Sequence, residues 1–72
     1  MCLSTVYELG AAGARRVLCE YTSNIRVAGD TITMIDLMGK EVSVTGTLQS
    51  VDLVKNTILI CPKDGKSAGA PL

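Results

Sequence analysis

The sequence predicts a small all-β domain: a curled antiparallel sheet or SH3-like barrel of six short strands. Three observations predict it. Apolar and polar residues alternate with a period of two, turn-forming residues recur at short intervals, and no segment carries apolar residues at helical spacing. The clearest alternation covers 41–48, where Val42, Val44 and Leu48 face one way. Gly46 within it favours a bend that lets the sheet close on itself.

The six expected strands are separated by turns rich in glycine and polar residues. They cover 2–9, 16–27, 31–38, 41–48, 50–54 and 57–61. The second is long enough for one bent strand or two short ones, with a bulge or break at 22–24. Residues 1–61 are therefore expected to form a single barrel domain, and 62–72 a flexible C-terminal tail of small and polar residues.

The expected core consists of the apolar residues that point inward in this pattern: Val6, Val17, Ile25, Val27, Ile32, Met34, Leu37, Val42, Val44, Leu48, Val51, Leu53, Ile58 and Ile60. Burial of each such side chain contributes roughly 1.5–3 kcal/mol. Chain entropy of about 1–2 kcal/mol per ordered residue consumes most of this gain. A chain of 72 residues therefore needs further stabilisation, usually from disulfides, a metal or oligomerisation.

Composition excludes several classes of function. The chain has no histidine, so a Ser-His-Asp or Cys-His site cannot form within it, and we expect no enzyme. A small RNA-binding barrel remains the alternative function, but such modules present a basic groove and stacking aromatics. Here the net charge is zero and only two tyrosines are present, which makes nucleic-acid binding the weaker hypothesis.

The cysteines indicate where chemistry could occur. Cys2, Cys19 and Cys61 are too few and too scattered for a disulfide framework, and no secretory or membrane segment is evident, so we expect a cytoplasmic protein with free thiols. Cys19 and Cys61 fit a structural role as small buried hydrophobes. Without a Cys-x-x-Cys pair, a structural zinc site is not expected.

Cys2 offers a chelating pair of donors. A small second residue normally allows removal of Met1, which leaves Cys2 with a free α-amine and a thiol on adjacent carbons. Two such chelates give an N2S2 set suited to Ni(II), with Cu(II) a chemical competitor, and the backbone amide of Leu3 could join it. The competing interpretations are that Cys2 is simply a small residue after the start, or an N-terminal nucleophile.

The opening Met1-Cys2-Leu3-Ser4-Thr5-Val6-Tyr7 resembles the start of the CooT family, as do the stretches 36–41, 44–46, 51–53 and 58–60. The family consists of small proteins linked to nickel insertion into carbon monoxide dehydrogenase, and it has also been labelled as predicted RNA-binding proteins. The resemblance covers roughly residues 1–61. It implies a homodimeric metallochaperone that holds one Ni(II) through Cys2 of both subunits and serves a nickel enzyme or its maturation factors.

Overall fold

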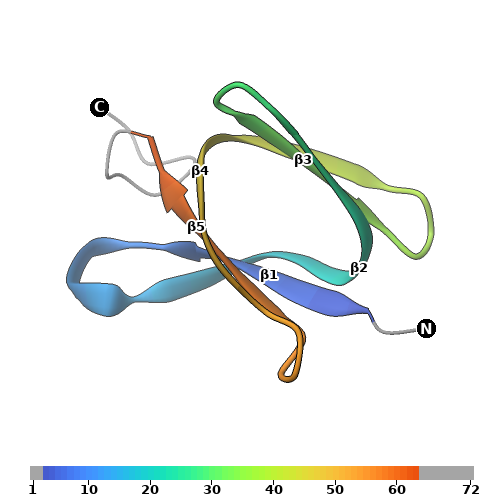
Figure 1. The fold of residues 1–72 in the computed structure, drawn as a ribbon, viewed down its shortest axis with the longest axis horizontal. Coiled ribbons are helices and arrows are strands. Elements are labelled where there is room, and N and C mark those ends of the chain that lie inside the picture. The colour runs from blue at the N-terminus through green and yellow to red at the C-terminus, as the bar shows by residue number, and fades with distance from the viewer. Residues whose placement is uncertain (1–2, 64–72) are drawn as a thin grey trace.

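Five strands close into a barrel in the computed structural model, which describes residues 3–63 (Figure 1). The strands are β1 (Ser4–Leu9), β2 (Arg15–Ala28), β3 (Thr31–Asp36), β4 (Glu41–Asp52) and β5 (Thr57–Pro62). A single-turn 3-10 helix, η1 (Ala11–Gly13), lies between β1 and β2. The predicted all-β barrel class is therefore confirmed. The expected tail falls outside the described residues from position 64 onward.

The number of strands is five rather than the predicted six, because the segments expected at 41–48 and 50–54 form one continuous strand. Within β4, Leu48 lies opposite Ile60 and Ser50 lies opposite Leu59, so Gln49 is an extra residue without a partner on β5. Such a bulge bends a strand without ending it. The polar stretch around Gln49 therefore marks a bulge and not a turn.

The strand count also fixes how the barrel closes. Strands joined in sequence by hairpins alternate in direction, so the first and last of an odd number run the same way. Accordingly β1 pairs in parallel with β5, from Thr5 opposite Thr57 to Glu8 opposite Ile60, whereas the other four neighbouring pairs are antiparallel. Closure leaves β1 hydrogen-bonded on both sides.

The two long strands, β2 and β4, pair with one neighbour along their first half and with the other along their second half. The first half of β2 pairs with β1 and the second half with β3, while β4 pairs first with β3 and then with β5. The predicted irregularity in β2 is confirmed as a register shift between Thr22 and Asn24 within one bent strand. Gly46 lies in a crowded place, since a Cβ there would lie 2.5 Å from the carbonyl oxygen of Cys61, and the bend expected there stays a prediction.

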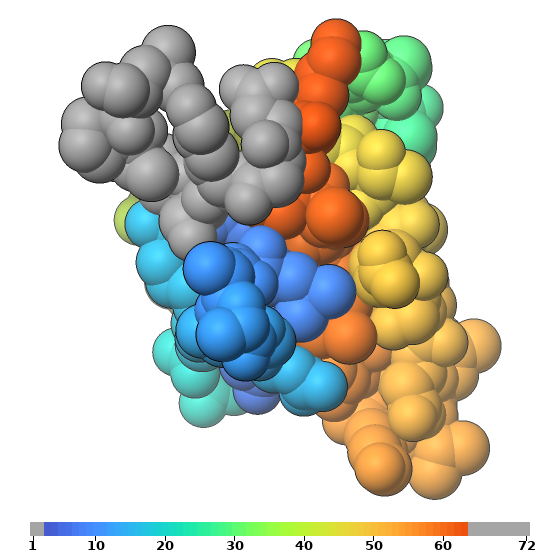
Figure 2. Space-filling view, turned by 90° about the vertical axis from the view of Figure 1, so that its left-hand side faces the viewer, coloured from blue at the N-terminus to red at the C-terminus, as the bar shows by residue number. Residues whose placement is uncertain are grey.

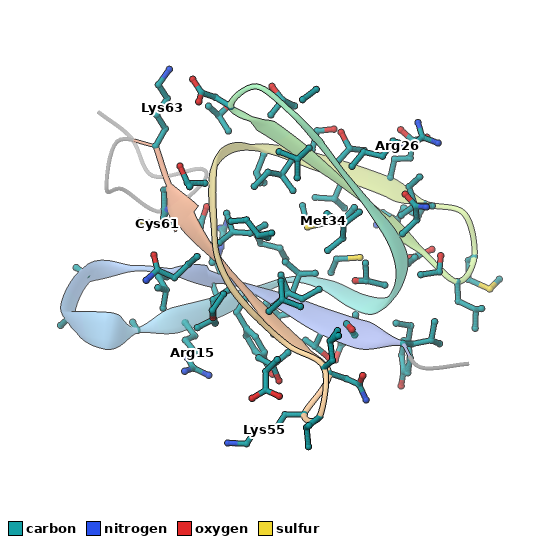
Figure 3. The ribbon with its side chains drawn as sticks, in the orientation of Figure 1. Arg15, Arg26, Met34, Lys55, Cys61 and Lys63 are labelled. Carbon is teal, nitrogen blue, oxygen red and sulfur yellow. The ribbon has the colours of Figure 1, made fainter. Side chains whose placement is uncertain are left out.

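The buried apolar core lies inside this ring of strands and consists of Val6, Cys19, Ile32, Met34, Ile58 and Ile60. Leu18, Ile25, Val42 and Val44 pack against it. Figure 3 shows Met34 pointing into the barrel, where its side chain is fully buried. Eight of the fourteen predicted core residues therefore belong to the core or pack against it.

The remaining six predicted core residues are exposed: Val17, Val27, Leu37, Leu48, Val51 and Leu53. Leu37 and Leu53 lie in turns, beyond the ends of β3 and β4. Val17 lies opposite Tyr7, after a register shift between Val6 and Tyr7 that turns this part of β2 outward.

The other three residues wrongly predicted in the core are exposed for a different reason. Leu48, Val51 and Val27 lie opposite Ile60, Ile58 and Ile32, so they share a side of the sheet with buried residues. They are exposed because they lie where β2 and β4 have a partner on one side only, away from the centre of the ring.

Candidate functional site

The start of β1 lies between two turns that are distant in the sequence. Ser4 is opposite Thr22, which is in turn opposite Asp36 at the end of β3. On the other side, the backbone N–H of Thr5 donates to the carbonyl oxygen of Asn56, 3.0 Å away, in the β4–β5 turn. We call this part of the barrel the chain-start end; it comprises the start of β1, Tyr21, and the segments 36–40 and 51–56 (Figure 1).

The predicted metal-binding residues, Cys2 and Leu3, directly precede β1 in the sequence. Leu3 is half-buried and directly precedes β1. Cys2 lies outside the described residues, so its donors remain a prediction. The sequence predicted no role for the two turns that flank the start of β1.

Large apolar side chains are exposed at the chain-start end to an unusual degree. Among residues 3–63, nine large hydrophobic side chains are exposed, and six of them gather here: Tyr21, Leu37, Met38, Val51, Leu53 and Val54. Met38 and Val54 are 88% and 92% exposed. Turns normally carry polar residues, and clustered apolar side chains on a surface usually mark an interaction site.

The two turns hold these side chains in the same way. In the β3–β4 turn, Asp36 Oδ1 accepts hydrogen bonds from the backbone N–H groups of Met38 and Lys40, both at 2.9 Å. In the β4–β5 turn, Asp52 Oδ1 accepts from those of Val54 and Lys55, at 3.0 and 2.9 Å. Each aspartate is followed by a leucine and a second apolar residue. An aspartate that accepts such bonds fixes the conformation of the turn.

The β3–β4 turn is also tied to a strained residue. Tyr21 has a φ of +54°, a left-handed conformation that bulky side chains rarely adopt and that costs roughly 1–2 kcal/mol. Its carbonyl oxygen accepts a hydrogen bond of 2.9 Å from the backbone N–H of Leu37. The register shift between Ser4 and Val6, which face Thr22 and Cys19, places a bulge here in β2, and the Tyr21 side chain is exposed.

The described residues provide no preformed metal site of their own. No group of three or more His, Cys, Asp or Glu side chains lies together within residues 3–63. The carboxylates of Asp36 and Asp52 accept backbone hydrogen bonds, and Cys19 is buried in the core, as the sequence predicted. Cys61 is half-buried on β5, near the opposite end of the barrel (Figure 3).

One charged residue inside the barrel was missed by the sequence analysis. Glu8 is only 1% exposed, and Arg16 Nη2 approaches its Oε1 to 3.4 Å from the neighbouring strand. The signal was present in the alternation of β1, because Glu8 is two residues from the inward-facing Val6. Glu8 lies four residues along β1 from Ser4, so it does not belong to the chain-start end.

Some of the aromatic and basic residues are engaged in contacts within the barrel. Tyr7 is half-buried, with the guanidinium carbon of Arg15 lying 5.9 Å from its ring centroid, and Arg16 is engaged with Glu8. Within residues 3–63 there is no helix long and apolar enough to cross a membrane.

Comparison with known proteins gives a consistent result. A search of curated proteins finds no match. Among solved structures, the barrel is similar to a crystal structure from Carboxydothermus hydrogenoformans that carries the CooT name, with a TM-score of 0.77 over 85% of this chain and 97% of the other. The identity is 11%, so this likeness supports the fold alone. The family model for CooT, the CO dehydrogenase accessory protein, matches residues 1–61, and the chain therefore belongs to the CooT family.

Proposed function

We propose that this protein is a nickel-binding accessory protein of carbon monoxide dehydrogenase maturation and works as a homodimer. The α-amine and thiolate of Cys2 from each subunit hold one Ni(II), after removal of Met1, and the backbone amide of Leu3 is available as a further donor. The observation that carries the proposal is family membership over residues 1–61, because CO dehydrogenase, which the family assists, is a nickel enzyme.

The chemistry of the donor set supports Cys2 as the binding residue. Nitrogen and thiolate donors together suit Ni(II), and both groups of Cys2 can lose a proton to a bound divalent cation. Within the described residues, the carboxylates of Asp36 and Asp52 are used to hold turns and that of Glu8 contacts Arg16. No alternative cluster of metal-binding side chains occurs there.

The barrel supports this role by fixing the start of β1. Ser4 and Thr5 are held between β2 and the β4–β5 turn by strand pairing and by the 3.0 Å bond from Thr5 to Asn56. A short segment anchored to a rigid wall loses less conformational entropy on binding than a free peptide would. The same apolar surface around this anchor can join two subunits, which the N2S2 donor set requires.

Native mass spectrometry of the purified protein, with and without nickel, tests the proposal. We expect a dimer with Met1 removed and one nickel ion. The substitution Cys2→Ser removes both thiolates, so we expect nickel affinity to fall at least about 100-fold. A form that retains Met1 should also bind more weakly, because its amine is one residue away from the thiolate.

Cys61→Ser serves as the matched control, because it removes one thiol from β5 and leaves the chain start unchanged. It should keep one nickel per dimer and the parental affinity. Equal nickel binding by Cys2→Ser and Cys61→Ser would refute the assignment to Cys2. Equal binding by the processed and Met1-retaining forms would refute the role of the amine.

A further inference from the structure

We infer that Asn56, the last residue of the β4–β5 turn, is a positioning residue for the chain start, and that nickel binding is coupled to the conformation of this turn. The inference rests on the proposed function for what the chain start binds. It adds which of the two neighbouring turns controls that binding, and through which contact.

The contact is a single backbone hydrogen bond. The N–H of Thr5 donates to the carbonyl oxygen of Asn56, 3.0 Å away, and Thr5 lies opposite Thr57 at the first step of the β1–β5 pairing. On the other side of β1, the pairing with β2 shifts in register between Ser4 and Val6. The bond to Asn56 is therefore the regular contact that fixes where β1 begins.

Asn56 makes this bond in an uncommon backbone conformation. Its φ is +54°, in the left-handed region. Asparagine tolerates this region better than most residues do, and β-branched residues tolerate it worst. A residue that leaves this region changes the direction in which the chain enters β5, so the carbonyl oxygen moves away from Thr5.

The rest of the turn supports Asn56 independently of the chain start. Asp52 Oδ1 accepts hydrogen bonds from the N–H groups of Val54 and Lys55, at 3.0 and 2.9 Å. Thr57 Oγ1 donates to the carbonyl oxygen of Lys55 at 3.2 Å. These bonds extend from the start of the turn to the residue after Asn56. A contact that is fixed beforehand lowers the entropy that the chain start loses on binding a ligand.

The β3–β4 turn provides an internal comparison. It is also held by an aspartate, Asp36, and it also contains a residue with positive φ, Gly39 at +87°. Its link to the neighbouring strand differs, because the N–H of Leu37 donates to the carbonyl oxygen of Tyr21 on β2, 2.9 Å away. Of these two turns, the β4–β5 turn is the one bonded to β1.

The short separation along the chain makes the coupling effective. Cys2 precedes Thr5 by three residues, a reach of at most about 10 Å. Loss of a group that holds a metal ligand in place typically lowers metal affinity about 10–100-fold. Coupling between two sites is reciprocal, so nickel must stabilise the bond between Thr5 and Asn56 by the same factor by which the bond raises nickel affinity.

Amide hydrogen exchange and nickel titration of the full chain test the inference, with Asn56→Val, Asn56→Gly and the control Gly39→Ala. We expect Asn56→Val to speed exchange at Thr5 in the metal-free protein and to lower nickel affinity about 10-fold. Asn56→Gly adopts the left-handed conformation without steric cost and should keep the wild-type values. Gly39→Ala strains the other turn, where nothing lies within 4 Å of the added Cβ, and should change neither. In the wild-type protein, nickel should slow exchange at Thr5.

The outcomes separate this inference from the proposed function. If Asn56→Val speeds exchange at Thr5 but keeps the wild-type nickel affinity and absorption spectrum, the coupling is refuted and the nickel proposal stands. An equal loss of affinity in Gly39→Ala also refutes the coupling, because damage to either turn would then suffice. Unchanged exchange at Thr5 in Asn56→Val refutes the positioning role.

A wild-type protein that binds no nickel refutes the proposed function and the coupling together. Exchange at Thr5 in the metal-free protein then decides whether Asn56 positions the chain start. Circular dichroism verifies that each variant is folded. Asn56→Ala, a milder change in the same direction, replaces Asn56→Val if that variant is not.

Discussion

The two ends of the barrel differ in what their turns contain and in what the turns do. At the chain-start end, two turns expose leucine, methionine and valine and are held by aspartate side chains. At the opposite end, the turns consist of small residues, and the backbones come close together: the N–H of Gly46 donates to Asp30 at 2.8 Å, and a Cβ on Gly46 would collide with Cys61. Figure 2 shows the β4–β5 turn standing out from the rest of the molecule.

The difference indicates that the two ends of the barrel have different roles. Close packing of the backbone around Gly46 closes the barrel at this end. Exposed apolar side chains, in contrast, lower the solubility of a lone monomer, and those at the chain-start end are typical of a surface that contacts a partner. Substitutions at the Gly46 end should therefore change mainly the free energy of unfolding. Those at the chain-start end should change mainly the affinity for a partner.

The largest expected effect is that of Gly46→Ala. The added methyl group would meet the Cys61 carbonyl oxygen at 2.5 Å and the Ile60 side chain at 3.2 Å, and backbone cannot move aside cheaply. We expect a loss of about 3 kcal/mol in the free energy of unfolding and a melting temperature lower by about 15 °C. Thermal unfolding at one fixed protein concentration measures both effects, because the proposed dimerisation would make the melting temperature concentration-dependent.

Gly13→Ala is the control for that substitution. Gly13 has a φ of +79° but open space around it, so alanine there meets only conformational strain of about 1 kcal/mol. Equal losses in the two variants would show that close contact at Gly46 does not set the closure of the barrel.

An intermediate effect is expected for Asp36→Ala at the chain-start end. It removes the acceptor for the N–H groups of Met38 and Lys40, which should cost about 1–2 kcal/mol and speed amide hydrogen exchange at both. Asp36→Asn keeps a side-chain oxygen and should lose less. If both variants retain wild-type exchange rates at Met38 and Lys40, the aspartate does not hold this turn.

The smallest effect is expected for Asp30→Asn at the opposite end. The contact between Lys63 and Asp30 is short, at 2.7 Å, but both side chains are mostly exposed. Such pairs contribute at most about 1 kcal/mol, and salt screens them. Urea unfolding at low and high salt should show a change below about 0.5 kcal/mol. A loss as large as that of Gly46→Ala would mean that charge, rather than close packing, holds this end.

The sequence predicted the parts of the fold that depend on local pattern. The alternation over 41–48 and the irregularity at 22–24 both followed from residue types whose backbone preferences are known. The family was also identified from the opening residues and is confirmed by the match over residues 1–61.

What the sequence did not predict depends on register and on contacts between distant strands. Val6 was correctly expected in the core, but the burial of Glu8 on the same face of β1 was missed, because the other face, with Tyr7 and Leu9, is the more apolar. The structure buries Glu8 against Arg16 from β2. A one-residue change of register reverses every side chain in a strand, and only the pairing with β2 and β5 decides it.

The candidate site was predicted only in part for a similar reason. Cys2 was selected from its donors, but nothing local in Asp36-Leu37-Met38 or Asp52-Leu53-Val54 shows that both turns flank the start of β1. Their leucines were predicted to be core residues because apolar residues usually are. Only strand pairing brings them to the chain-start end.

The parallel pairing of β1 with β5 has a practical consequence for handling the protein. β1 begins at Ser4 and β5 ends at Pro62. The parallel register places these two residues about six positions apart along the strands, or roughly 20 Å. A purification tag or fluorophore placed beyond the end of β5 thus leaves the start of β1 unmodified, whereas an N-terminal fusion would occupy the amine on which the proposed chelation depends.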